Sequence, residues 1–362
     1  MRKSQRFIEH AFLRLILICF ASSAINAEEF KVDSTEELRQ LLDLLNKENK
    51  SEQVTIFLSD GIYESAVNIL IRRSNIHIRS QSASAKQVIL IGKGMEKSNY
   101  DESIFDVSGS NITISDITLK NASNHLIQIR AEKNADYFTL RNCILQDAFQ
   151  QLIKVSGVLN GEYSDYGVVE NNLFEYTAGI GPNYYIGGID AHRARFWKVS
   201  NNRFYNIASP RDRVAEHAIH FWNGSSDNEI THNLIVDSDR AIGFGMHEQR
   251  SPTYGGRIAH NHIIHTNSMH PFADAGITLE SSPGTTVLNN IIYMTSDYPN
   301  AIEYRFSETK NVLIENNITN KAIKARGRAK ATLKNNTSQS AIGNFFTTFY
   351  YNLKIIKKRL FN

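Results

Sequence analysis

Residues 168–174 have the sequence Val-Val-Glu-Asn-Asn-Leu-Phe, and residues 198–204 repeat the pattern as Lys-Val-Ser-Asn-Asn-Arg-Phe. In both stretches an apolar run leads into an asparagine pair, and a second apolar run follows. The same unit recurs in both directions along the chain. Its turn positions are Asp116, Asn142, Asn171, Asn201, His232, His260, Asn289, Asn316 and Asn335. Successive turns are 26 to 31 residues apart, except for a final step of 19. A fixed period in this range predicts a solenoid.

The composition of the repeats favours a right-handed parallel β-helix in the all-β class. Each apolar run is short and alternating, as expected of strands, and is rich in Val, Ile, Leu, Phe and Thr. Asparagines stacked at one turn of successive coils can hydrogen-bond to each other as a ladder, which accounts for 35 asparagines in 362 residues. Cys143 occupies one ladder position and is predicted to be a buried structural thiol.

A second strand in each coil carries an isoleucine that we expect to stack inside the helix. Because successive side chains of a strand point to opposite faces, the residues directly before and after each inward-facing position then face outward. One outward column contains Gln128, Lys154, Asp190, His220, Gly243, Thr278, Glu303 and Lys324. Two residues further along each strand, a second column contains Arg130, Ser156, His192, Trp222, Gly245, Glu280, Arg305 and Arg326. Because adjacent coils lie about 4.8 Å apart, Asp190 is predicted beside His220 and His192 beside Trp222.

This outward face predicts a shallow trough. Its walls are the histidine side and the Glu280, Glu303 and Arg305 side, and the glycines form a floor that a ligand approaches. Long loops flank the same coils, as expected for the binding face of a solenoid. They supply aromatic side chains for stacking on sugar rings and arginines for binding carboxylates.

The two ends of the chain differ in composition from its body. Residues 1–27 have a basic start and a short apolar core, which predicts a signal peptide and a secreted or periplasmic protein. Residues 341–362 form a C-terminal cap or a basic tail, and residues 28–340 form the β-helix domain. Ser34 predicts the N-cap of a short helix over Glu36–Leu45 that covers the first coil.

The net charge of +3 comes from these ends, which leave a mildly acidic body. The charge therefore gives no argument for nucleic-acid binding. No span of the mature chain is expected in a membrane, and we expect a monomer.

The repeats and the Asp60-Gly61-Ile62-Tyr63 stretch resemble the parallel β-helix carbohydrate-active proteins, a superfamily that includes polysaccharide lyases and mannuronan epimerases. Asp190-Ala191-His192-Arg193 is similar to the Asp-Pro-His-Asp stretch of the epimerases, with Ala and Arg in place of Pro and the second Asp. The resemblance implies a polysaccharide-active protein on an acidic, uronate-containing glycan.

Removal of a uronate C5 proton needs a base, an acid and a group that neutralises the carboxylate. His192 or His220 is a candidate base, with Asp190 orienting it, and Tyr254 or a second histidine is a candidate acid. The candidates for neutralising the carboxylate are Arg193, Arg195, Arg211 and Arg250. The candidate catalytic residues are His192, His220, Asp190, Arg193, Arg250 and Tyr254. The candidate substrate-binding residues are Trp222, Tyr184, Tyr185, Arg195, Arg211, His217, His247, Glu280 and Arg305. Calcium is a further candidate for neutralising the carboxylate, held by Asp190, Glu216 or Glu280.

Three alternatives stay open beside a lyase that acts by β-elimination. One is a C5 epimerase of the mannuronan type. Another is a non-catalytic glycan-binding or cell-surface protein. The third is a glycoside hydrolase, which requires two suitably spaced carboxylates such as Asp190 with Glu280 or Glu303.

Overall fold

The computed structural model describes residues 28–48, 50–65, 68–97, 102–210, 213–247, 251–266 and 273–338. The predicted signal peptide and the predicted C-terminal segment lie outside these ranges. So do two candidate site residues, Arg211 and Arg250.

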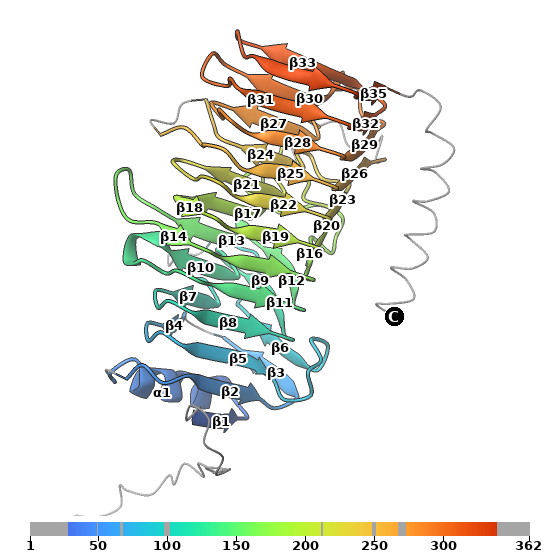
Figure 1. The fold of residues 1–362 in the computed structure, drawn as a ribbon. Coiled ribbons are helices and arrows are strands. Elements are labelled where there is room, and N and C mark those ends of the chain that lie inside the picture. The colour runs from blue at the N-terminus through green and yellow to red at the C-terminus, as the bar shows by residue number, and fades with distance from the viewer. Residues whose placement is uncertain are drawn as a thin grey trace, which may run out of the picture.

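Within the described residues the chain winds through three long parallel sheets, visiting each sheet once per coil (Figure 1). Sheet 1 contains β1 (Glu28–Val32), β2 (Val54–Leu58), β5 (Ile76–Ser80), β8 (Ile112–Ser115), β11 (Thr139–Arg141), β15 (Val168–Glu170), β19 (Lys198–Ser200), β22 (Glu229–Thr231), β25 (Arg257–Ala259), β28 (Thr286–Leu288), β31 (Val312–Glu315) and β34 (Ala331–Lys334). Sheet 2 contains β3 (Gly61–Glu64), β6 (Val88–Ile91), β9 (Thr118–Ala122), β12 (Ile144–Ala148), β16 (Leu173–Glu175), β20 (Arg203–Tyr205), β23 (Leu234–Val236), β26 (His262–His265), β29 (Ile291–Met294), β32 (Ile318–Thr319) and β35 (Thr337–Ser338).

Sheet 3 contains β4 (Ile69–Ile71), β7 (Phe105–Val107), β10 (Ile127–Arg130), β13 (Gln151–Ser156), β17 (Gly187–His192), β21 (Ile219–Trp222), β24 (Ile242–Phe244), β27 (Ile277–Glu280), β30 (Asn300–Arg305) and β33 (Ala322–Arg326). A short pair, β14 (Ser164–Asp165) and β18 (Ala194–Arg195), lies on the turn that follows sheet 3. This architecture is the predicted right-handed parallel β-helix.

The core consists of apolar side chains stacked coil upon coil. Ile189 pairs in register with Ile153 and with Ile219, and both neighbours are fully buried. Phe174 and Phe204 stack in the same manner with ring centroids 4.4 Å apart. The inward and outward alternation along each strand therefore follows the prediction, and it sends every second residue of sheet 3 to the outside.

The asparagine pairs lie on the turn between sheets 1 and 2. The first member of a pair adopts a left-handed backbone conformation, as at Asn171 and Asn201, which asparagine tolerates better than most residues. The second member, such as Asn172 or Asn202, is buried. Its side-chain oxygen accepts from the asparagine one coil earlier, so that Asn172 Nδ2 donates to Asn202 Oδ1 at 3.0 Å. Cys143 takes the equivalent place one coil earlier and donates its backbone N–H to Asn172 Oδ1.

The N-terminal end of the solenoid carries helix α1 (Thr35–Leu45), which lies beside β1 and β2 (Figure 1). The Ser34 hydroxyl accepts from the Glu37 backbone N–H, as the capping pattern predicts. Leu38, Leu41, Leu42 and Leu45 face the first coil and are buried. Among the described residues, no helix has the length and apolar character needed to cross a membrane.

Candidate functional site

The outward face of sheet 3 brings chemically reactive side chains from three successive coils together. Asp190 on β17 pairs in register with Lys154 on β13 and with His220 on β21, and His192 pairs with Trp222. These pairings are the ones that the sequence columns predicted. Lys154 belongs to the same column but was not among the candidate site residues.

Lys154, Asp190 and His192 form a connected cluster. The Lys154 ammonium contacts both the Asp190 carboxylate and His192 Nε2, the latter at 2.8 Å. Trp222 Nε1 donates to the other Asp190 oxygen at 2.5 Å. The side chains of Lys154 and His192 are 13% and 15% exposed, whereas that of Asp190 is 5% exposed. Solvent therefore reaches the lysine and the histidine, and Asp190 supports them from below.

The hydrogen bonds around His192 fix its tautomer. An ammonium group only donates, so Nε2 must accept from Lys154 and its lone pair must be free of a proton. Nδ1 then carries the hydrogen. Asn223 Nδ2 lies 3.3 Å from His192 Nδ1, so this hydrogen finds an acceptor only when the Asn223 amide is turned to bring its oxygen to the ring.

Electrostatics keep Asp190 ionised and His192 neutral. Burial would raise the pKa of Asp190, but the nearby charge of Lys154 and the contact with His192 hold that pKa well below its usual value. Burial lowers the pKa of His192, and Lys154 adds to the effect, while Asp190 partly opposes it. A neutral imidazole beside an ammonium group combines a base with a positive charge.

His220 and His217 lie deeper than His192. They are 1% and 5% exposed, and their ring centroids are 4.4 Å apart. His220 Nε2 lies 3.0 Å from the Gly245 carbonyl oxygen, and His220 Nδ1 lies 3.8 Å from Asp190. The Trp222 ring stacks on His220, with ring centroids 5.6 Å apart. It also contacts the His192 ring, with centroids 4.1 Å apart.

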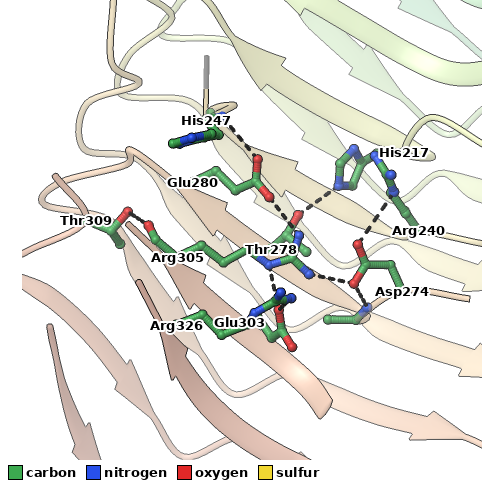
Figure 2. A network of polar contacts seen from close by, with 12 residues as sticks. His217, Arg240, His247, Asp274, Thr278, Glu280, Glu303, Arg305, Thr309 and Arg326 are labelled. Carbon is green, nitrogen blue, oxygen red and sulfur yellow. Dashed lines mark hydrogen bonds and ion pairs between the residues drawn. The ribbon is translucent and has the colours of Figure 1, made fainter. Parts of the chain in front are cut away.

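We predicted that the glycines on this face leave room for a ligand, and for Gly243 this is wrong, because the room is taken by His217. A Cβ on Gly243 would lie 2.6 Å from His217 Nε2, so this glycine makes room for the imidazole of the preceding coil. His217 crosses Gly243 and reaches Thr278 Oγ1 at 2.8 Å, as Figure 2 shows. The middle of the trough is therefore filled by a side chain of the protein.

The other wall of the trough is an ion-pair network centred on Arg305 (Figure 2). Its guanidinium contacts Glu280 at 2.7 Å, Glu303 at 2.5 Å and Asp274 at 2.6 Å. The Glu303 side chain is fully buried and also binds Arg326. Burial opposes the charge of Arg305, yet these carboxylates raise its pKa further. His247 joins the network through its backbone N–H to Glu280 and stacks on Phe306.

Two more of the candidate arginines, Arg193 and Arg195, lie on the turn after sheet 3 and bind the protein itself. Arg193 donates to backbone carbonyls of Gly161 and Glu162. Arg195 forms a two-point ion pair with Asp165, and its guanidinium lies over the Tyr163 ring. Neither guanidinium joins the Lys154 cluster.

The candidate aromatic residues flank sheet 3 on both sides. Tyr184 and Tyr185 lie in the loop before β17 and are each 43% exposed, with Arg213 over the Tyr184 ring at 4.9 Å. Tyr254 lies on the opposite turn, where it bridges to Ser226 and is 53% exposed. The exposed aromatic groups thus border the face rather than contact the histidines.

The carboxylates proposed for calcium are poorly arranged for that ion. Asp190 is bound by Lys154 and Trp222, and Glu280 by Arg305. Glu216 lies beside His217 and His220. Calcium needs six to eight oxygen ligands, whereas the neighbours here are cations and imidazoles.

Neither the protein-family models nor the curated proteins that were searched contain a match to this chain. Solved structures do resemble it. An alginate lyase from Paenibacillus sp. str. FPU-7 aligns over 85% of this chain and 97% of the lyase, with a TM-score of 0.50 and 12% identity. The catalytic domain of a GH87 alpha-1,3-glucanase aligns over 84% of this chain and 56% of its own length, with a TM-score of 0.53 and 15% identity.

PfbA, a surface adhesin of Streptococcus pneumoniae, aligns over 84% of this chain and 89% of the adhesin, with a TM-score of 0.52 and 12% identity. These structural neighbours include carbohydrate-active enzymes with parallel β-helices, and they establish the fold. Since the three differ in what they do, the function has to be argued from the site.

Proposed function

We propose that this chain is an exported polysaccharide lyase that cleaves a uronate-containing acidic glycan by β-elimination. The observation that supports it most strongly is the contact between the Lys154 ammonium and the neutral His192 imidazole above the buried Asp190. An elimination needs a positive charge for the uronate carboxylate and a base for the C5 proton, and this cluster offers both within 2.8 Å.

In the proposed reaction a substrate carboxylate replaces His192 as the partner of Lys154. This exchange frees the Nε2 lone pair, which removes the C5 proton. The electron pair of the C5–H bond then forms the C4–C5 double bond while the C4–O bond breaks, and the leaving oxygen takes up a proton from Tyr254 or from water. Asp190 stays ionised throughout and positions Lys154.

The remaining candidate residues take supporting roles in this proposal. Trp222 is a partly exposed indole at the edge of the cluster, suited to stacking on a sugar ring. Tyr184, Tyr185 and Tyr254 extend the apolar surface to the two sides. His217 and His220 are too deeply buried to reach a glycan, so they act behind the contact surface.

A glycoside hydrolase is less well supported, because both carboxylates named as partners of Asp190 are already bound within the protein. Glu303 is fully buried and is held by Tyr298, Asn300, Arg305 and Arg326. Glu280 accepts from Arg305 and from His247.

The test is incubation of the purified protein with alginate, pectate and glycosaminoglycans while unsaturated product is followed by its ultraviolet absorbance. We expect product on at least one uronate polymer, and a rate lower by about 100-fold or more in His192→Ala or Lys154→Ala. A folded wild-type protein that yields no such product would contradict the lyase. Exchange of C5 hydrogen with solvent deuterium would then identify an epimerase, and glycan binding that survives His192→Ala would identify a binding protein.

A further inference from the structure

Three side chains of metal-binding type meet where the chain enters β21. One carboxylate oxygen of Glu216 and one ring nitrogen each of His217 and His220 lie within 4.8 Å of one another. Glu216 and His217 end the loop that precedes the strand, and His220 points outward from the strand itself. Part of this cluster's surroundings, including His217 and Arg240, is drawn in Figure 2.

Both histidines have the Nε2 atom anchored by the protein. A carbonyl oxygen only accepts, so His220 donates Nε2–H to Gly245, and its Nδ1, 3.8 Å from Asp190 Oδ1, is the nitrogen that no backbone group engages. His217 Nε2 contacts the Thr278 hydroxyl, while His217 Nδ1 is buried and has no hydrogen-bond partner within the described part of the chain. A bare acceptor costs less in the interior than a bare N–H, so Nδ1 carries the lone pair here as well. Metal-binding histidines are usually oriented in this way through the second nitrogen.

The carboxylate is also incompletely paired. Glu216 Oε2 is buried and has no hydrogen bond among the described residues. Its nearest cationic partner, Arg240, lies 3.9 Å away and is shared with Asp274 at 3.7 Å. A buried carboxylate oxygen and a buried imidazole nitrogen, both without a hydrogen-bond partner among the described residues, leave a cost that a bound cation would remove.

We propose that Glu216, His217 and His220 bind one divalent transition-metal ion of the zinc class. Two imidazole nitrogens and one carboxylate suit zinc or cobalt, whereas calcium and magnesium prefer oxygen ligands alone. Ligand atoms around zinc at about 2.1 Å are about 3.4 Å apart, so the three side chains close in by small rotations and water completes the tetrahedron. The ion ties the loop that ends at Glu216 to sheet 3. The proposal does not depend on lyase activity.

The test is a titration of chelator-treated full-length protein with Zn²⁺, followed by calorimetry and thermal unfolding. We expect one tight equivalent and a higher Tm with zinc, and no Tm change with Ca²⁺. Glu216→Gln and His217→Gln, whose near-native shape keeps the fold, are expected to weaken zinc binding at least tenfold. Co²⁺ gives an independent measure, because its visible absorption reports tetrahedral nitrogen and oxygen ligands and should change in Glu216→Gln.

The matched control is His260→Ala. The His260 ring stacks on His232 with centroids 5.0 Å apart on a different face, and this surface pair is the alternative place for an adventitious ion. Zinc binding that is lost in His260→Ala and kept in Glu216→Gln would overturn the proposal. A wild-type protein that binds no zinc would overturn it too, whatever the outcome of the glycan assays.

Discussion

The outward face of sheet 3 has two halves that look alike in sequence and differ in how their charges are satisfied. In the half around β13, β17 and β21, Lys154, Asp190 and His192 leave one imidazole neutral and partly exposed. In the half around β27, β30 and β33, the guanidinium of Arg305 is bound by three carboxylates at once. Both halves place acidic and basic residues in the same outward columns.

The difference indicates that a charged column suits catalysis where a neutral base has a single partner that a substrate can replace, as Lys154 is for His192. Every acid around Arg305 is paired, so this half can stabilise the coils but has little to offer a substrate. The histidine half pays a stability cost for its neutral imidazoles and retains a base. If this comparison holds, substitutions in one half should affect activity and those in the other should affect stability.

The largest expected effect is on activity, in His192→Ala. Loss of a general base typically costs 10²–10⁴ in rate, so we expect turnover on the uronate polymer to fall about 100-fold or more. Because the His192 side chain is only 15% exposed, its truncation should also lower the free energy of unfolding, but by less than Arg305→Leu does. Rates of product formation and urea denaturation measure the two quantities.

His260→Ala is the matched control, because this histidine lies on the turn between sheets 1 and 2, away from the cluster. Its turnover should match the wild type. If His192→Ala keeps more than half of the activity, the division of the face into a reactive and a structural half is wrong.

The second effect is on stability, in Arg305→Leu. The change leaves Glu303, which is fully buried, together with Glu280 and Asp274 without their central cation. Removal of one partner from a buried ion pair costs about 3–5 kcal/mol, and we expect a loss of this size in the free energy of unfolding. Arg305→Lys keeps the charge but not the contact with all three carboxylates, so its free energy of unfolding should lie between those of the wild type and Arg305→Leu. A loss below about 0.5 kcal/mol would show that this network is not structural.

Much of this division could be predicted from the sequence and some of it could not. The repeat period set the register, so the neighbours Asp190 with His220 and His192 with Trp222 follow from counting residues. Counting also places Lys154 beside Asp190, although Lys154 was not a predicted site residue, since histidine and arginine are the more usual base and carboxylate-binding residues.

What the sequence could not show is the direction in which long side chains extend. Arg193 and Arg195 turn away toward the loop at 161–165, and His217 reaches over Gly243 to a strand two positions along the sheet. These choices depend on which buried acceptors each coil leaves open. The period of the repeat carries no information about them.

The third effect is on the pH dependence of stability and concerns His125, which lies just before β10 and contacts β13 of the reactive half. Burial lowers the pKa of His125 to about 4 from 6.5, and its Nδ1 donates to the Gln151 carbonyl at 2.9 Å. Between pH 6.5 and 4 the unfolded chain binds a proton that the folded chain does not, so stability is complete above pH 6.5 and falls as the pH falls through this window.

The loss of stability that His125 causes at low pH is on the order of 3 kcal/mol at most. It should disappear in His125→Asn, whose amide can still donate to the Gln151 carbonyl. The measurement is urea unfolding at a series of pH values from 7.5 downward, in wild type and variant. Parallel curves for the two proteins would contradict a buried neutral His125.

The smallest expected effect tests the edge of the structural half, in Arg326→Leu. Like Arg305, Arg326 contacts Glu303, in its case at 3.0 Å. The Arg326 side chain is 56% exposed, however, so water screens this ion pair. Because Arg305, Tyr298 and Asn300 still satisfy Glu303, the free energy of unfolding should change by less than about 1 kcal/mol. Urea denaturation of the single variants and of the double variant with Arg305→Leu gives the coupling between the two arginines. If Arg326→Leu costs as much as Arg305→Leu, the network extends to the solvent edge and the contrast between a centre and a rim within this half has to be abandoned.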